Sequence, residues 1–170
     1  MLNEKELTTQ QYYLSPGYIY VSRVPTVVST VLGSAVSVCI FNKKKKIGAI
    51  NHFLYPEIKD KNKATPLYGN VSTLALVRFM LEAGSKVGHL VAQILGGAYN
   101  SEISKIRDIG KENVQIARRV LMRMGVKIIS EDVGGVLGRK IVFDTATNEI
   151  AVLKVERLRA CDWYPYEGLR

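Results

Sequence analysis

The stretch from Ser29 to Pro56, STVLGSAVSVCIFNKKKKIGAINHFLYP, decides how the chain folds. Between positions 36 and 40, valine and isoleucine alternate with serine and cysteine, the period-2 pattern of a β-strand. Residues 42–46 form a polar break, after which the chain resumes extended, apolar character. The stretch therefore predicts a hairpin that brings position 35 toward His52. A nucleophile and its base require such an arrangement, but Ala35 has no nucleophilic atom.

Short motifs from this stretch and from later ones occur in the order typical of one family. They are Leu32–Cys39, Gly48–Pro56, Gly96–Ala98, Ile109–Val114, and Asp132–Gly135 followed by Gly138–Lys140. In these motifs the chain resembles CheD, the chemoreceptor glutamine deamidase of bacterial and archaeal chemotaxis, over the span from Tyr18 to Val155. One such motif is weak, whereas five in order are specific. The family has its catalytic cysteine after Leu-Gly-Ser, where this chain has Ala35.

The resemblance implies a cysteine acyl transfer, in which a thiolate attacks a glutamine carboxamide, ammonia leaves and water hydrolyses the thioester. Such chemistry needs a base, a group that orients the base, and donors for the oxyanion. The resemblance places the nucleophile at Ala35 and the base at His52. It assigns Ser29, a threonine in the family, to orient His52. Thr30 is the neighbouring candidate, but on a strand it points to the opposite face.

Further site residues are predicted around the Gly33 turn. Its tight geometry leads us to expect oxyanion donors among the backbone N–H groups of Ser34 to Val36. The resemblance places Gly96, Gly97 and Ala98 near the substrate. We expect the glycine pairs at 96–97 and 134–135 to mark turns with positive φ or close backbone approach. Neither a cofactor nor a metal is expected.

Alanine at position 35 removes the attacking atom, so we expect covalent catalysis to be abolished in this chain. Two explanations are open: a deliberate replacement of the cysteine, or a natural paralogue that kept the scaffold. The intact His52, the hydroxyl at Ser29 and the unchanged flanking Gly-Ser favour the deliberate replacement. Cys39 lies four residues further along a predicted core strand, where a free cysteine usually behaves as a small hydrophobe.

Composition indicates a soluble globular protein with one domain, since 170 residues can bury a substantial core. The sequence predicts no signal peptide and no bilayer-spanning run. Two cysteines make neither a disulfide framework nor a metal cluster, and a cytoplasmic location fits best. The net charge of +9 suits nucleic acid, anionic lipid or an acidic protein surface. The basic residues are scattered, however, and the four lysines at 43–46 are interpreted as a solvated turn.

The order of the predicted elements indicates an α/β or α+β arrangement with largely antiparallel or mixed sheets. The resemblance implies an α+β fold, a layered sandwich of mixed sheets covered by helices, and kinship with cysteine deamidases of the cytotoxic necrotizing factor type. We expect a loose lead-in over 1–16, one domain over 17–157 and a tail over 158–170. The predicted strands are 18–21, 26–32, 90–95, 126–130, 139–144 and 149–155, besides the hairpin. Two helices are predicted, one from an Asn70 N-cap to Gly84 and one from an Asp108 N-cap to Gly125. Residues 55–69 are predicted to form a long loop, which is either a mobile flap or binding loop beside the site or a variable surface excursion.

Two functional hypotheses follow from the resemblance. The first is a chemoreceptor glutamine deamidase whose substrate is the helical cytoplasmic region of methyl-accepting chemoreceptors, with the nucleophile missing here. The alternative is a non-catalytic interaction module that binds receptors or the phosphatase CheC. Nucleic-acid binding is a weaker third hypothesis, because no recognisable motif accompanies the charge. A binding module would hold its partner whatever stands at position 35, whereas the enzyme would turn over only with cysteine there.

Overall fold

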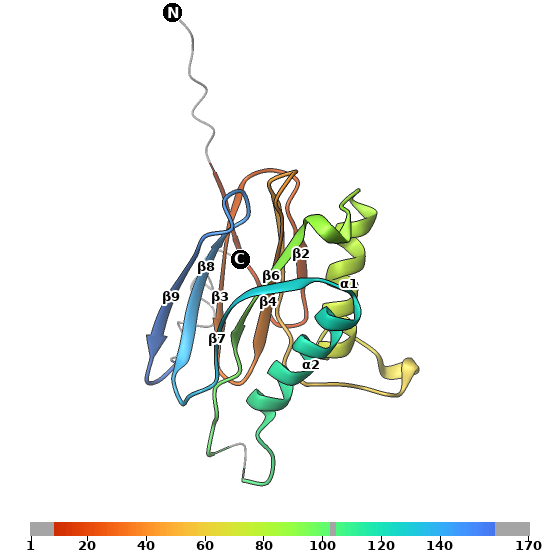
Figure 1. Cartoon of the computed structure of the whole chain (residues 1–170). Helices are drawn as coiled ribbons and strands as arrows, with labels where there is room; N and C mark the ends of the chain where they lie inside the picture. The colour runs from red at the N-terminus through yellow and green to blue at the C-terminus, as the bar shows by residue number, and fades with distance from the viewer. Residues whose placement is uncertain (1–8, 103–104, 159–170) are drawn as a thin grey trace, which may run out of the picture.

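Two β-sheets stack face to face, and two helices cover the outer face of one of them (Figure 1). The computed structural model describes residues 9–102 and 105–158. The five-stranded sheet has the order β2 (Ile19–Val21), β5 (Ile47–Asn51), β4 (Val36–Asn42), β6 (Leu90–Gly96) and β7 (Lys127–Val133). The four-stranded sheet has the order β1 (Gln10–Tyr13), β3 (Thr26–Leu32), β8 (Gly138–Asp144) and β9 (Ile150–Val155). The helices are α1 (Gly69–Glu82) and α2 (Ile109–Arg123), and short 3-10 turns occupy Lys61–Lys63 and Val87–His89.

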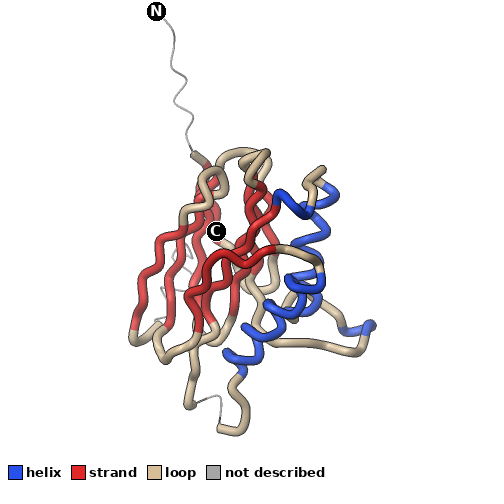
Figure 2. The backbone as a smooth tube through the Cα atoms, in the orientation of Figure 1, coloured by secondary structure: helices blue, strands red, loops and turns tan. Residues whose placement is uncertain are grey.

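The sheets are mixed, as predicted. The pairs β1–β3 and β6–β7 are parallel, and the remaining neighbours are antiparallel. Figure 2 shows the resulting layers: strands of both sheets lie side by side, and the helices lie along one side only. The arrangement is that of an α+β sandwich, and the two helices cover the five-stranded sheet. Within the described residues, no helix is long and apolar enough to cross a membrane.

Strand β4 is the centre of the molecule, and all seven of its residues are buried. Its alternation serves two cores. Val36, Val38 and Ile40 pack toward α1 and α2. Cys39, and Ala35 just before the strand, pack toward the four-stranded sheet, where they meet Phe143. The period-2 pattern in the sequence therefore separates a helix-facing core from a core between the sheets.

The two helices begin for different reasons. Asp108 is the N-cap of α2, as predicted, and its carboxylate accepts a hydrogen bond from the Lys111 N–H at 3.0 Å. The predicted Asn70 cap is wrong, because α1 begins at Gly69 with Tyr68 as the N-cap residue. The Asn70 side chain instead bonds both the N–H and the carbonyl of Ile58. Asn70 thus ties down the long loop.

The lead-in prediction is wrong for residues 10–13, which form β1. This strand pairs in parallel with β3, from Gln10 beside Thr26 to Tyr13 beside Ser29. The segment Gln-Gln-Tyr-Tyr has no alternation of apolar and polar residues, so only tertiary pairing reveals the strand. Leu14 follows it and is completely buried. Most of the predicted tail, residues 159–170, lies outside the described residues.

Both predicted glycine pairs have positive φ: Gly96 and Gly97 lie at the end of β6, and Gly134 and Gly135 lie between β7 and β8. Gly96 and Gly97 have φ of 104° and 68°, and Gly134 and Gly135 have φ of 76° and 69°. A side chain at Gly96 would bring its Cβ to 2.3 Å from the Ala35 carbonyl oxygen. Glycine is needed at this position for both conformation and space.

We expect Gly96→Ala to lower the free energy of unfolding by about 2 kcal/mol or more, because it combines strain at positive φ with a backbone clash. The matched control is Gly88→Ala, since no atom lies within 4 Å of a Cβ at Gly88 and its φ is not positive. Urea denaturation of both variants checks the difference. Equal midpoints for the two variants would contradict the role given to Gly96.

Candidate active site

His52 follows β5 directly and lies buried between the two sheets, with 1% of its surface exposed. Its Nδ1 atom lies 2.8 Å from the Oγ1 of Thr30, which belongs to β3 in the facing sheet. The Thr30 hydroxyl also donates a hydrogen bond to the Leu14 carbonyl at 2.7 Å. The imidazole is therefore held from across the interface between the sheets.

This hydrogen-bond chain fixes the tautomer of His52. A hydroxyl has one proton, and Thr30 gives it to the Leu14 carbonyl. Toward His52 the hydroxyl can then only accept, so Nδ1 bears the proton and Nε2 has the free lone pair. Nε2 has no hydrogen-bond partner in the described part of the chain. Burial lowers the pKa of His52 to about 4, against a smaller opposing effect of the Leu14 carbonyl. The imidazole is a neutral base at ordinary pH.

The prediction that Ser29 orients His52 is corrected to Thr30. Buried and half-buried residues alternate along β3, with Thr26, Val28 and Thr30 on the buried face. Ser29 and Thr30 do point to opposite faces, as the sequence analysis assumed, but the face toward His52 is that of Thr30. Ser29 is half-buried on the other face, and its backbone carbonyl accepts from the Leu14 N–H.

Ala35 lies immediately before β4, with 3% of its surface exposed. Val36 and Phe53 exchange two backbone hydrogen bonds, of 3.1 and 3.0 Å. This register sets Ala35 opposite Leu54, so His52 is its diagonal neighbour on the same face, and such positions are typically about 7–8 Å apart. The predicted approach of position 35 to His52 is present in the fold.

The backbone around Ala35 corrects one predicted oxyanion donor. The Val36 N–H already donates to the Phe53 carbonyl and is not free for a ligand. The N–H groups of Ser34 and Ala35 have no acceptor among residues 9–102 and 105–158. The prediction of Val36 as an oxyanion donor is wrong, because backbone pairing with Phe53 already begins at this residue.

Asn113, on α2, forms hydrogen bonds to the Gly33–Ala35 turn and to the strand segment opposite it. Its Nδ2 donates to the carbonyls of Ser34 and Leu54, both at 2.9 Å. Ser34 precedes Ala35 and Leu54 lies opposite it, so one amide group links the two chain segments at the site. Asn113 lies in the motif Ile109–Val114, but no role was predicted for it. The sequence places this asparagine beside Val114, on the apolar stripe of the helix, and a polar side chain that is buried there needs hydrogen-bond partners.

Gly97 connects the turn to a neighbouring pocket. Its N–H donates to the Ala35 carbonyl at 2.8 Å, and the Ala98 N–H donates to the Gly33 carbonyl at 3.0 Å. Gly97 also lines a pocket of about 240 Å³. The other lining residues come from the loop after β6, from α2 and from the end of β7: Tyr99, Asp108, Lys111, Val114, Gln115, Arg118, Val133, Gly134 and Gly135. Of the predicted substrate-binding residues, Gly97 lines this pocket, whereas Gly96 and Ala98 support the turn.

Arg139 forms hydrogen bonds to the segment that lines one side of this pocket, at the end of β7. It is buried, and it donates to the Asp132 carboxylate at 2.9 Å and to the carbonyls of Gly134 and Leu137. Partial burial favours the neutral acid, but hydrogen bonds from Arg139 and Lys154 hold the pKa of Asp132 below its usual value. Arg139 therefore links β8 to the end of β7 and to Gly134, which lines the pocket.

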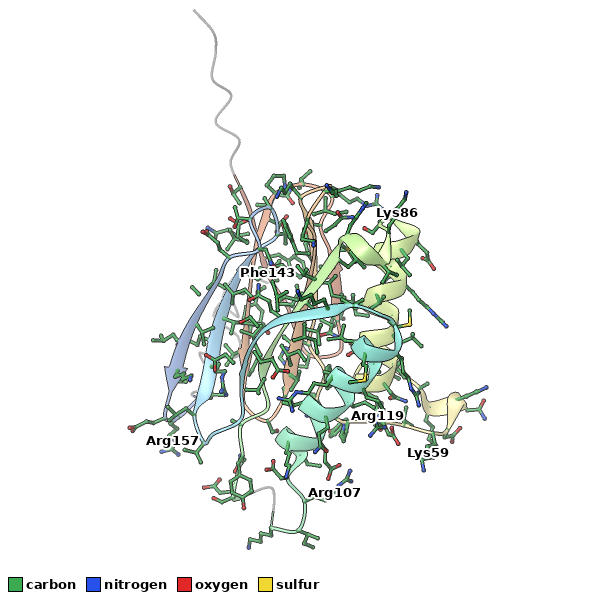
Figure 3. All side chains as sticks on the ribbon, viewed as in Figure 1. Lys59, Lys86, Arg107, Arg119, Phe143 and Arg157 are labelled. Carbon is green, nitrogen blue, oxygen red and sulfur yellow. The ribbon has the colours of Figure 1, made fainter. Side chains whose placement is uncertain are left out.

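The remaining candidates have structural roles. Cys39 is fully buried, and desolvation raises the pKa of its thiol, so it is not a substitute nucleophile. In the described ranges, no three His, Cys, Asp or Glu side chains group as metal ligands. In Figure 3 the labelled basic side chains lie on separate parts of the surface, Arg119 on α2 and Lys59, Lys86, Arg107 and Arg157 in different loops, whereas Phe143 belongs to the core between the sheets. This distribution agrees with a scattered, solvated charge.

The low pKa of His52 predicts a pH-dependent stability. The unfolded chain protonates this histidine below pH 6.5, whereas the folded chain resists protonation down to about pH 4. The contribution, on the order of 3 kcal/mol, is therefore present above pH 6.5 and lost as the pH falls toward 4. We expect the slope of unfolding free energy between pH 6.5 and 4 to flatten in His52→Gln. His89→Gln is the control, and the same flattening there would contradict the assignment.

Loss of the Asn113 amide leaves two carbonyls without their donor. We expect Asn113→Ala to destabilise the fold by roughly 2–4 kcal/mol in urea denaturation. Asn62→Ala, at an exposed position in a 3-10 turn, is the control and should change stability by less than about 0.5 kcal/mol. A neutral Asn113→Ala would mean that the turn holds without the amide.

Comparisons with known proteins identify the family of this chain. The family model described as CheD chemotactic sensory transduction matches residues 54–154, more than half of the 170 residues. A Sulfurimonas denitrificans protein named "Probable chemoreceptor glutamine deamidase CheD" is 32% identical, covering 87% of this chain and 96% of the relative. A Trichlorobacter lovleyi protein of the same name is 34% identical, covering 83% and 88%. "Probable chemoreceptor glutamine deamidase CheD 1" of Anaeromyxobacter dehalogenans is 38% identical, covering 78% of each chain. The resemblance found in the motifs is confirmed, and the chain belongs to the CheD family.

Proposed function

We propose that this chain has the site of a chemoreceptor glutamine deamidase in which alanine fills the position of the nucleophile. The observation that carries the proposal is the neutral His52 imidazole. Its Nδ1–H is engaged by Thr30, its Nε2 is unpartnered within the described residues, and the strand register puts His52 on the same face as position 35. Relatives over most of the chain are named as deamidases. A base in this state is what a cysteine at position 35 would need.

The reaction follows from that geometry once a thiol stands at position 35. Nε2 of His52 takes the thiol proton, and the sulfur attacks the carboxamide carbon of a glutamine. The N–H groups of Ser34 and Ala35 stabilise the oxyanion. The imidazolium returns its proton to the departing nitrogen, which leaves as ammonia, and water then hydrolyses the thioester to glutamate. With Ala35 the first bond cannot form, so this chain binds without turning over.

The substrate we propose is the glutamine-bearing helical cytoplasmic region of chemoreceptors. Lys111, in the pocket that Gly97 lines, would favour acidic side chains near the target glutamine, whereas Arg118 there is already paired with Glu131. The net charge of +9 supports the same class of partner. We also propose that the chain is related to cysteine deamidases of the cytotoxic necrotizing factor type and that it acts in the cytoplasm.

Ala35 itself favours a second candidate, a binding module for receptors or for the phosphatase CheC. No hydrogen bond that shapes the turn uses the side chain at position 35, because Gly97 and Asn113 bond backbone carbonyls. The scaffold can therefore persist without the nucleophile. Retained binding together with absent chemistry is the signature of this candidate.

The test compares this chain with its Ala35→Cys variant on a receptor cytoplasmic fragment, using intact-mass and peptide mapping. We expect specific glutamines to gain the mass of deamidation only with the cysteine variant, because only that variant has an attacking atom. If neither protein converts glutamine although the fragment binds, the deamidase proposal fails and the binding module takes its place.

Two hydroxyl deletions in the Ala35→Cys background separate the neighbouring candidates for orienting His52. Thr30→Val should lower turnover by roughly tenfold to hundredfold, the range typical of a partner that orients an imidazole. Ser29→Ala removes a hydroxyl from the opposite face and should leave turnover within about twofold. The reverse outcome would restore Ser29 as the orienting residue.

A further inference from the structure

Ser37 is a buried polar residue that the chemistry above does not use. It lies in β4, none of its surface is exposed, and its Oγ atom has no hydrogen-bond partner within the described ranges. A buried hydroxyl without a partner costs about 1–3 kcal/mol, so its presence needs an explanation. Ser72 on α1 is in the same state elsewhere in the fold.

The strand register brings Ser37 to His52. Val36 pairs with Phe53 and Cys39 pairs with Ile50, so the intervening Ser37 stands opposite His52. Since Ala35 is two residues away on the same strand, Ser37, Ala35 and His52 share one face. Two unpartnered polar atoms, Ser37 Oγ and His52 Nε2, therefore belong to residues that face each other across the strand pair.

The ladder between the two strands is interrupted at this place. The Val38 N–H bonds the side-chain Oδ1 of Asn51 at 2.7 Å, where a regular ladder would use a backbone carbonyl. The Asn51 amide is thus inserted between the strands, and backbone pairing resumes only at Val36 and at Cys39. Ser37 and His52 flank this interruption and do not bond each other, so one small group that bonds both would satisfy both unpartnered atoms.

We propose that Ser37 is a positioning residue that holds the water for hydrolysis of the thioester, an inference that rests on the proposed function. A water molecule can donate to His52 Nε2 and bond the Ser37 hydroxyl at once, which satisfies both atoms. Its oxygen attacks the thioester carbon, and His52 takes one water proton. The carbon–sulfur bond breaks, the sulfur leaves as thiolate and recovers the proton from His52, and glutamate is released. Ser37 acts only in this second half of the reaction.

The experiment uses the Ala35→Cys protein and a receptor cytoplasmic fragment, with Ser37→Ala added. We expect the first turnover to release ammonia at an unchanged rate, and steady turnover to fall about tenfold or more. A covalent enzyme–substrate adduct should then accumulate in intact-mass spectra. Added hydroxylamine should release the adduct, because it attacks a thioester without needing the held water.

Ser72→Ala in the same background is the matched control, since it makes the same chemical change at an equally buried, equally unpartnered hydroxyl on α1. It should leave both phases unchanged and accumulate no adduct. Equal slowing of ammonia release and steady turnover by Ser37→Ala, or no adduct at all, would overturn the assignment of Ser37 to hydrolysis.

A crystal structure of the unsubstituted chain separates failure of this inference from failure of the proposed function. We expect an ordered water within hydrogen-bond distance of both Ser37 Oγ and His52 Nε2. If the water is present but Ala35→Cys never deamidates, the water site stands and the proposed function fails. If Ser37 bonds His52 directly, or no water lies between them, the inference about Ser37 is overturned whatever the activity. This measurement also serves if Ser37→Ala does not fold.

Discussion

The hydrogen-bond chain from the Leu14 carbonyl through the Thr30 hydroxyl to His52 joins the two sheets at the candidate site. Each member comes from a different part of the fold: Leu14 follows β1, Thr30 lies in β3, and His52 ends the β5 segment. These hydrogen bonds set the orientation and the tautomer of the imidazole, and its burial lowers its pKa and keeps the base neutral. A slip of β3 by one residue would turn Thr30 to the outer face and remove its hydrogen bond to His52.

The hydrogen bonds around position 35 do not involve its side chain, which packs in the core between the sheets. Gly97 bonds the Ala35 carbonyl, Asn113 bonds the carbonyls on either strand, and Val36 pairs with Phe53. The turn is therefore specified by backbone and by groups outside it. The hydrogen bonds of the turn therefore do not depend on which side chain stands at position 35, and the Nε2 atom of His52 has no hydrogen-bond partner in the described part of the chain.

The sequence predicted most elements because their patterns are local. The strand over 26–32 and the Asp108 cap are present as predicted. The errors share one cause, which is dependence on partners distant in sequence. The polar segment of β1 becomes a strand only by pairing with β3, and Asn70 is used by the loop at Ile58 rather than by its own helix. Likewise, the Val36 N–H is taken by Phe53, which no turn rule can foresee.

The sequence by itself determined the family, the hairpin that brings position 35 toward His52, and the absence of a nucleophile at Ala35, because motifs and alternation are properties of neighbouring residues. Only the tertiary structure decided which hydroxyl serves His52. Both faces of β3 carry apolar residues and a hydroxyl, with Val27, Ser29 and Val31 on one and Val28, Thr30 and Leu32 on the other. Alternation shows that the faces differ but not which one is turned inward. That choice was made by packing against the second sheet, where burial of Val28 and Leu32 brings Thr30 to the histidine.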